Sequence, residues 1–493
     1  MKKLLIVIFT FALFLLVGCT AKTTASPTKG STTTEDKGTT KPNVTTTLSE
    51  NDKYWDKDEN GIPDWQEEEI TLTYATWQYN DDTQVTIDTM MLDAFMTKYP
   101  NITVTMQIVG EDYEWDTNMQ AQAEVNNLPD VFLVYRLETA LPYGLLADIT
   151  DFYAHDDSAE YMFDSVKDAG TYKGVRYAVP TFIYPSYWFV NLDILTNNGI
   201  PKPSYDWTWD QMESIAQSCY NESEHIVGQY GVSSYWRELP KILSGNKDWS
   251  AFTYDGEKFN FDSPYFEQSF TKLTEALERH AVTAEYGEET LTTYYGDPAY
   301  LVDYNGSAAI WVAPAWEAKG YFETMNFNWD VYPAPGGCTG GNIDIAGISS
   351  TCAHKEAAYQ LLKWMSYSEE GLVTRFSLYE DYGSILFKSA NNYPYPVVDY
   401  GINAKGQNLV WDNIPYNNAP GMTSPQMINS LNNAALWGNK EVVGWDAVDT
   451  AINTYFDDIY YGTDTFANLK ETIISLGNQA LIDFREAFDV LIG

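Results

Sequence analysis

The chain opens its regular part with an alternation of apolar and polar positions, followed by apolar residues at helical spacing. Between 70 and 74 every second residue is apolar, which predicts a β-strand. Apolar residues then recur at helical spacing over 87–95, Tyr99-Pro100 ends that pattern, and the period of two returns over 102–108. These segments predict two parallel strands joined by a helix in a right-handed crossover.

Three later segments fit the same kind of architecture. A short apolar strand is predicted over 131–134, directly after Pro129-Asp130. Thr208 and Gln211 have the spacing of a capping box, and residues 357–365 carry an amphipathic helical face. We therefore predict an α/β fold in which helix dominates toward the C-terminus.

The N-terminal segment has the pattern of a secretion signal. A basic start precedes an almost unbroken apolar run, Leu4–Val17, which ends in Gly18-Cys19. The run is too short and wrongly flanked for a transmembrane helix, and no other stretch is long and apolar enough to be one. We predict a lipoprotein signal peptide over residues 1–18 and lipidation of Cys19. The alternative is an ordinary signal peptide followed by a chance cysteine.

Residues 19–49 are rich in Thr, Ser, Lys and Gly and almost lack large apolar side chains. Such a segment buries too little surface to offset its ordering entropy. We predict a flexible tether between a lipid anchor and the folded part.

Residues 50–69 contain a loop with the spacing of an EF-hand-type calcium site. Gly61 stands at the sharp turn of this loop, whereas Pro63 is unusual inside it, and no convincing helix is predicted before it. The predicted ligands are Asp56, Asp58, Asn60, Ile62 through its carbonyl, Asp64 and Glu67. Hard oxygen ligands at this spacing wrap one Ca²⁺, with the structural role of stiffening the tether. The alternative is a solvated acidic turn.

Composition and charge narrow the possible partners. The 493 residues suggest about two or three domains. Acidic residues outnumber basic ones by 69 to 29, and the formal net charge of −40 disfavours nucleic acid as a partner. Aromatic residues make up 15% of the chain, and their flat apolar faces suit both cores and sugar-stacking sites.

The cysteines leave two possibilities open. Cys219, Cys338 and Cys352 are an odd number, so they cannot all pair. Cys338 and Cys352 would close a short loop in an oxidising exterior, and three buried thiols are the alternative. The cysteines and histidines show no zinc-site spacing.

Short segments in a fixed order over residues 70 to about 370 resemble the extracellular solute-binding proteins of family 1, which supply sugars to ATP-driven importers. Phe95–Ile102, for example, reads FMTKYPNI, and Leu128–Phe132 reads LPDVF. The other matching segments are Gly144–Ile149, Tyr172–Pro180, Tyr187–Leu195, Pro203, Thr208–Asp210, Gly306–Trp316, Pro333–Gly337 and Ala357–Ser368. Cys338, Cys352 and the calcium loop depart from the family pattern, and the last 120 or so residues match only in being helical and aromatic-rich.

The resemblance implies a two-lobed periplasmic-binding-protein-like fold of type II with a hinge between the lobes. Its expected boundaries are 70–181 with 307–350 for lobe I, and 182–306 with 351–493 for lobe II. The implied function is that of a monomeric, lipid-anchored receptor on the extracellular face of the cell membrane. It would hold a carbohydrate in the interlobe cleft and deliver it to the transmembrane subunits of an ABC permease.

The candidate ligand contacts follow from where strands end, because ligands of open α/β sheets bind at the carboxyl ends of strands. Trp77, Tyr135 and Trp316 are predicted stacking platforms, with Asp81 and Arg136 as hydroxyl partners. Further candidates are Tyr79 from the first loop, and Tyr184, Tyr187, Trp188, Tyr235 and Trp236 from lobe II. For each aromatic the alternative is core packing, and for Asp81 and Arg136 the alternative is a surface ion pair.

Catalytic signatures are absent from the sequence. It has no G-x-S-x-G elbow, Walker A loop, dinucleotide glycine motif or H-E-x-x-H pair. We therefore expect a binding protein and not an enzyme. A secreted hydrolase that uses two of the 69 acidic residues, or a receptor for a peptide or other polar solute, remains the alternative.

Overall fold

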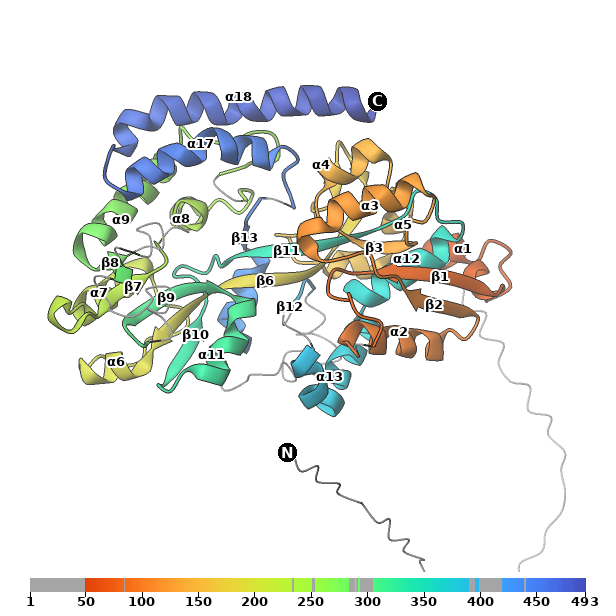
Figure 1. Cartoon of the computed structure of the whole chain (residues 1–493), viewed down its shortest axis with the longest axis horizontal. Coiled ribbons are helices and arrows are strands. Elements are labelled where there is room, and N and C mark those ends of the chain that lie inside the picture. The colour runs from red at the N-terminus through yellow and green to blue at the C-terminus, as the bar shows by residue number, and fades with distance from the viewer. Residues whose placement is uncertain are drawn as a thin grey trace, which may run out of the picture. The chain divides into compact units, whose positions relative to one another are not determined.

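The computed structural model describes residues 49–83, 85–232, 235–250, 253–282, 289, 291–292, 305–389, 395–398, 419–438 and 440–493 (Figure 1). The chain divides into Met1–Thr47 and Leu48–Gly493, and all described residues belong to the second unit. The predicted signal peptide, Cys19 and nearly all of the predicted tether therefore lie outside the described residues.

The helices and strands of this unit have the following bounds. The strands are β1 Ile70–Ala75, β2 Ile102–Met106, β3 Val131–Val134, β4 Thr171–Tyr172, β5 Val175–Arg176, β6 Ala178–Asn191, β7 Val227–Tyr230, β8 Ala281–Val282, β9 Ala308–Pro314, β10 Trp329–Tyr332, β11 Gly340–Ile348, β12 Tyr395–Pro396 and β13 Ala435–Leu436. The α-helices are α1 Glu50–Trp55, α2 Ile87–Lys98, α3 Trp115–Glu124, α4 Leu137–Ala140, α5 Thr150–Ala154, α6 Leu192–Asn197, α7 Trp209–Cys219, α8 Tyr235–Ser244, α9 Pro264–Arg279, α11 Ala318–Thr324, α12 Lys355–Ser366, α13 Glu369–Ser389, α16 Pro425–Asn432, α17 Trp445–Tyr460 and α18 Phe466–Ile492. Short 3-10 helices are η1 Asp64–Gln66, η2 Asp112–Glu114, η3 Leu141–Tyr143, η4 Asp157–Tyr161, η5 Glu222–Glu224, η9 Ala315–Glu317 and η11 Pro420–Thr423.

Lobe I is built on the predicted β-α-β unit. The strand β1 pairs in parallel with β2, Leu72 opposite Val104, and in parallel with β3 on its other side. Thr86 caps α2 through a capping box, and Met91 and Phe95 of this helix are fully buried against the sheet. The predicted parallel β-α-β unit and the α/β fold class are confirmed.

The strands β6 and β11 run through both lobes (Figure 1). All 14 residues of β6 are buried, because its first half pairs with β11 and its second half with β9 and β10. Pro180 and Pro185 lie inside β6 and have no N–H to donate, and the ladder to β11 shifts register at Asp344. The two lobes therefore share one continuous sheet.

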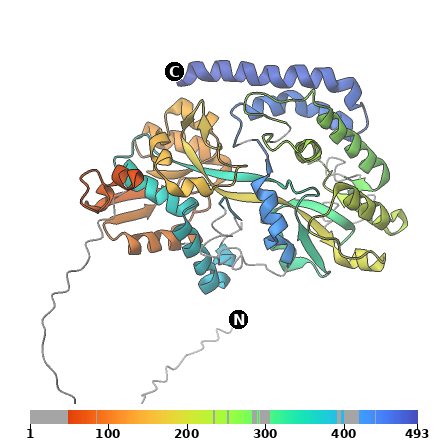
Figure 2. The ribbon, with the colours of Figure 1, turned by 180° about the vertical axis from the view of Figure 1, so that it is seen from behind.

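Lobe II is built on β7, β8 and β9, which pair in parallel next to β6. The capping box of Thr208 and Gln211 that starts α7 is present as predicted. Helices α17 and α18 pack against each other along this lobe (Figures 1 and 2). Although α18 has 27 residues, neither it nor any other helix in the described part has the apolar length that a bilayer requires.

The expected lobe boundaries are wrong after residue 306. Helices α12 and α13 pack on α2 and not in lobe II, because the apolar face of α12 around Leu361 covers β3 and β11. Conversely, β9 and β10 belong to lobe II, where Ile310 is fully buried among its helices. Residues 307–339 therefore lie in lobe II and residues 351–389 in lobe I, which is the reverse of the assignment that the resemblance implied.

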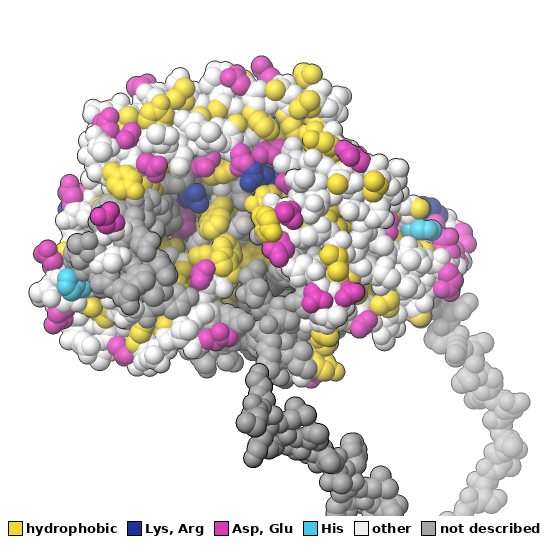
Figure 3. All heavy atoms as spheres, viewed as in Figure 1, with side chains coloured by type: hydrophobic (Ala, Val, Ile, Leu, Met, Phe, Trp, Pro, Cys, Tyr) yellow, Lys and Arg dark blue, Asp and Glu magenta, His cyan; other side chains and the backbone are white. Residues whose placement is uncertain are grey.

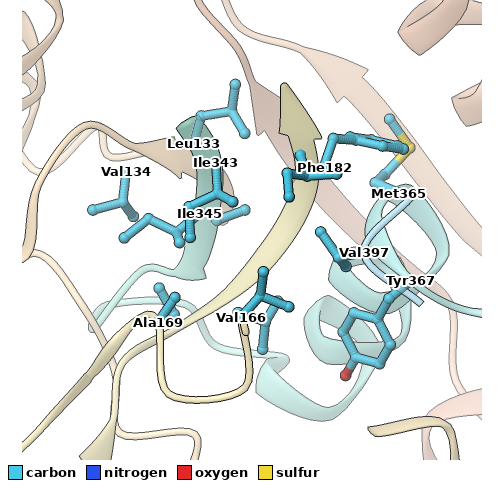
Figure 4. Packing of buried hydrophobic residues seen from close by; sticks show 14 of the residues in the cluster. Leu133, Val134, Val166, Ala169, Phe182, Ile343, Ile345, Met365, Tyr367 and Val397 are labelled. Atoms are coloured by element: carbon cyan, nitrogen blue, oxygen red, sulfur yellow. The ribbon is translucent and has the colours of Figure 1, made fainter. Parts of the chain in front are cut away.

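Two hydrophobic clusters fill the interior. Figure 4 shows part of the first, in which Leu133 and Val134 of β3 meet Ile343 and Ile345 of β11, with Phe182 of β6 nearby. The second lies among α7, α9, α17 and α18. Cys219, Cys338 and Cys352 are free and buried, so the possible Cys338–Cys352 disulfide is not formed.

Candidate functional site

Two aromatic side chains stand at the carboxyl ends of neighbouring strands in lobe I. Trp77 follows β1 and Tyr135 follows β3, and their ring centroids lie 6.2 Å apart at 80°. The buried Trp115 of α3 supports Trp77 edge-on at 5.5 Å. Trp77 and Tyr135 are half-buried, so each offers part of its ring to the surface. The structure thus brings together two of the three predicted platforms directly.

Residues 437–438 and 440–446, called here the 437–446 segment, cover this pair from the second lobe. Arg136 forms an ion pair with Asp446 of the segment, and its guanidinium lies 5.1 Å from the Tyr135 ring centroid. The N–H of Gly444 donates a hydrogen bond of 2.7 Å to the Glu138 carboxylate. Arg136 therefore lies beside Tyr135, and its ion-pair partner is Asp446 and not Asp81.

A second aromatic group is centred on Trp316. Its ring lies 5.8 Å from Trp437 and 6.0 Å from Tyr184, both edge-on. The Arg237 guanidinium lies 5.7 Å from the Trp437 ring centroid. The 437–446 segment therefore contacts both aromatic groups, the Trp77–Tyr135 pair through Lys440 and Trp316 through Trp437.

The buried end of Tyr184 leads to a small polar cavity of about 20 Å³, enough for one water molecule. Tyr184 donates its hydroxyl to Asp344 at 3.0 Å, and Thr181 donates to the Asp344 carbonyl oxygen at 3.1 Å. The Arg375 guanidinium lines the same cavity and donates to Asp88 at 3.0 Å. A network of buried charges thus fixes the position of the Tyr184 ring.

The space-filling view shows that the surface is hollowed between the lobes (Figure 3). Hydrophobic side chains line the floor of this hollow, and Lys or Arg side chains lie at its margin together with acidic ones. Flat apolar faces beside charged groups are the combination that binds a solute with both C–H faces and hydroxyls.

Carboxyl groups around the Trp77–Tyr135 pair are poorly solvated. Burial raises the pKa of Asp116, and the positive charges of Lys440 and Arg136 offset part of this rise. Burial also raises the pKa of Glu138, whereas the hydrogen bond from the Gly444 N–H and the charge of Arg136 lower it. Desolvated carboxylates of this kind are stabilised by any hydroxyl group that donates to them.

Several predicted residues are not brought to this region. Trp188 is fully buried in the second cluster, edge-on to Trp209 at 5.6 Å, and Tyr187 is buried likewise. These two side chains are core residues because the whole of β6 is covered on both faces. Tyr79 is also buried, and Asp81 is exposed and accepts hydrogen bonds from Thr83 within its own turn.

The side chains of Tyr235 and Trp236 lie outside the described residues. Sequence reasoning missed Trp437, Lys440, Arg237 and Glu138. The only signal that marked the 437–446 segment was its pair of tryptophans, Trp437 and Trp445, in a part of the chain with no specific resemblance.

The predicted calcium loop folds back on itself. Carboxylate oxygens of Asp56, Asp58 and Asp64 lie within 4.8 Å of one another. The Asn60 side chain contacts Asp58 at 2.9 Å and Glu67 at 2.6 Å, which closes the ring of predicted ligands. The donor set of carboxylate and amide oxygens fits Ca²⁺.

The flanks of this loop correct one expectation. Helix α1 leads directly into the loop, with Ser49 and Asp52 forming a capping box, although no helix was predicted there. The 3-10 helix η1 follows and buries Trp65 against Tyr99. The loop is also tied to α12 by an ion pair between Lys57 and Glu356.

Comparisons with known proteins point in one direction. Residues 80–371 match the family described as bacterial extracellular solute-binding protein. No curated protein matches the chain by sequence.

Solved structures share the fold at low sequence identity. One is an ABC substrate-binding protein from Listeria monocytogenes in complex with cycloalternan, with 20% identity and a TM-score of 0.56, covering 86% of this chain and 100% of that one. The cyclic α-maltosyl-1,6-maltose binding protein of Arthrobacter globiformis has 14% identity and a TM-score of 0.63, covering 84% and 99%. A sugar-binding protein of Xanthomonas citri has 14% identity and a TM-score of 0.59, covering 85% and 99%.

Proposed function

This chain belongs to the bacterial extracellular solute-binding proteins, and on that premise we propose that it binds a sugar or oligosaccharide between its lobes and delivers it to an ABC permease. The observation that carries the proposal is the aromatic lining of one region from both lobes. Trp77 and Tyr135 come from strand ends of lobe I, and Trp316 and Trp437 from lobe II and the segment that joins it. The solved structures of similar fold, whose names state a sugar ligand, support the choice of ligand class.

The shared sheet suggests how the ligand is held. Rotation of the lobes about β6 and β11 would bring the Trp316 group and the Trp77–Tyr135 pair onto opposite faces of one sugar. A ligand that contacts both lobes favours the closed state, because its contacts are complete only there. The permease would then distinguish closed from open protein.

We propose that the solute is released unaltered. Overnight incubation with polysaccharides, followed by a reducing-end assay, separates this function from a secreted hydrolase. Saturable binding without turnover supports the receptor, and turnover would establish the enzyme. A receptor for a peptide or other polar solute is the outcome if peptides stabilise the protein and sugars do not.

We further propose that Cys19 carries the lipid anchor and that the protein acts as a monomer on the extracellular side of the membrane. The support is the sequence pattern that ends in Gly18-Cys19. Metabolic labelling with a palmitate analogue should mark the wild type and not Cys19→Ser, and equal labelling of both would exclude this anchor.

The sugar site is tested by two tryptophan substitutions. After a thermal-shift screen over mono- and oligosaccharides has found a ligand, Trp77→Ala and Trp316→Ala should each weaken its binding by about 1–3 kcal/mol. The reason is loss of a stacking face, and titration calorimetry measures the change. Trp55→Ala, a half-buried tryptophan of α1, is the matched control and should leave the affinity unchanged. Unaltered affinity in both cleft variants would remove these residues from the site.

The loop at 56–67 is proposed to bind one Ca²⁺ with a structural role. Calorimetry should show saturable Ca²⁺ binding to the wild type, weakened on the order of tenfold or more by Glu67→Gln, because the charge and bidentate reach of the ligand at the end of the loop are lost. Asp81→Asn, another exposed acidic turn residue, is the control. Equal heats from the wild type and Glu67→Gln would identify the loop as a solvated acidic turn.

A further inference from the structure

The ammonium group of Lys440 is enclosed by the residues predicted to stack on a ligand. Its Nζ lies 4.3 Å from the ring centroid of Tyr135 and 5.3 Å from that of Trp77. It also donates a hydrogen bond to the Tyr135 carbonyl oxygen. Lys440 is only 6% exposed, so its charge is held almost entirely by protein groups.

The surroundings have the chemistry of an ammonium site. Two aromatic faces attract a cation through their quadrupoles, and a carbonyl oxygen accepts a hydrogen bond from it. An aromatic pair and a carbonyl oxygen together match a primary ammonium group better than a neutral one.

Lys440 belongs to a segment that is anchored in the second lobe. Val442 and Trp445, which follow it in the chain, are buried in the second hydrophobic cluster. The segment also touches lobe I through the Arg136–Asp446 ion pair and the bond from Gly444 to Glu138. Lys440 is more buried than the Arg136–Asp446 pair, whose side chains are 23% and 46% exposed.

We propose that the rings of Trp77 and Tyr135 and the Tyr135 carbonyl oxygen form a primary-ammonium site occupied by Lys440, and that this lysine latches the 437–446 segment to lobe I in the ligand-free protein. If the proposed sugar-binding function holds, a solute that stacks on Trp77 must displace the lysine. Ligand binding and release of the latch are then one event.

Hydrogen exchange of the ligand-free full-length protein tests the latch without reference to any sugar. In Lys440→Met, which keeps the apolar stem, amide exchange in 437–446 and 133–138 should rise about tenfold while β1 is unchanged. Lys440→Arg should keep most of the protection. Lys98→Met is the matched control, because Lys98 also lies near an aromatic ring, at 5.2 Å from Tyr99, but pairs with Glu370 within lobe I.

Chemical rescue tests the ammonium site itself. Adding n-propylammonium chloride to Lys440→Met should restore protection in 133–138 and raise its melting temperature more than sodium chloride of equal ionic strength, with no such difference in the wild type. Unchanged exchange in Lys440→Met, or an equal rise in Lys98→Met, would overturn the latch. Loss of protection that n-propylammonium does not restore would overturn the ammonium site. A failure of the sugar proposal would leave all of these results unaffected.

Discussion

Replacing Arg375 with methionine is expected to lower the free energy of unfolding by about 3–5 kcal/mol. Arg375 is 3% exposed and donates to Asp88 at 3.0 Å and to the Met365 carbonyl oxygen at 3.4 Å. Its removal would leave the Asp88 carboxylate buried without its cation, in a cavity that Asp344 also lines. Breaking a buried pair on one side is far more destabilising than losing a surface pair.

Urea unfolding followed by tryptophan fluorescence measures this effect. Adding Asp88→Asn to Arg375→Met should recover part of the loss, because the unpaired charge is then removed. Lys98→Met breaks the more exposed pair with Glu370 and should change stability by less than about 1 kcal/mol. A loss below 1 kcal/mol in Arg375→Met would show that Asp88 finds other partners.

The stability of the wild type is expected to fall as the pH rises from about 5 to 9, by roughly 2–4 kcal/mol from Glu238 alone. Glu238 of α8 is 2% exposed, and burial raises its pKa to about 8 against weaker effects of the Trp188 indole and the Gly340 N–H. Between its unfolded pKa of 4.5 and its folded pKa of about 8, the folded state holds a proton that the unfolded state has lost. The contribution of Glu238 to the free energy of unfolding is therefore fully present below pH 4.5 and is lost as the pH rises through about 8.

Glu238→Gln isolates this contribution. The amide has nearly the same shape and no charge, so its stability curve should be flatter than that of the wild type over the same pH range. Glu441, whose pKa burial raises to about 7, titrates in the same direction and should leave a residual slope in both proteins. Parallel curves from urea unfolding at each pH would contradict the assignment to Glu238.

The elements that the sequence predicts well are those whose burial is one-sided. In β1 and α2 one face is buried and the other exposed, so the strand period of two and the helical spacing can be recognised in the sequence. The strand β6 is buried on both faces and contains Pro180 and Pro185, which argue locally against a central strand. Its length could therefore not be predicted.

The candidate site divides in the same way. Trp77 and Tyr135 were predictable because they follow recognisable strands, and strand ends locate ligand sites in α/β sheets. Trp188 and Trp77 look equivalent in the sequence, and only the packing of β6 makes one a core residue. Lys440 reaches its place through contacts between residues some 300 positions apart, such as that with Tyr135, and no local pattern encodes such contacts.

The continuity of β6 through both lobes has a consequence for how the chain acquires its structure. Residues 178–185 pair within one half of the sheet and residues 186–191 pair within the other, so both halves depend on the same strand. A fragment truncated on either side of it would expose a sheet edge whose missing neighbour cannot be supplied by any other segment. We expect the two halves to become native only together, in a single cooperative step, and not as autonomous folding units.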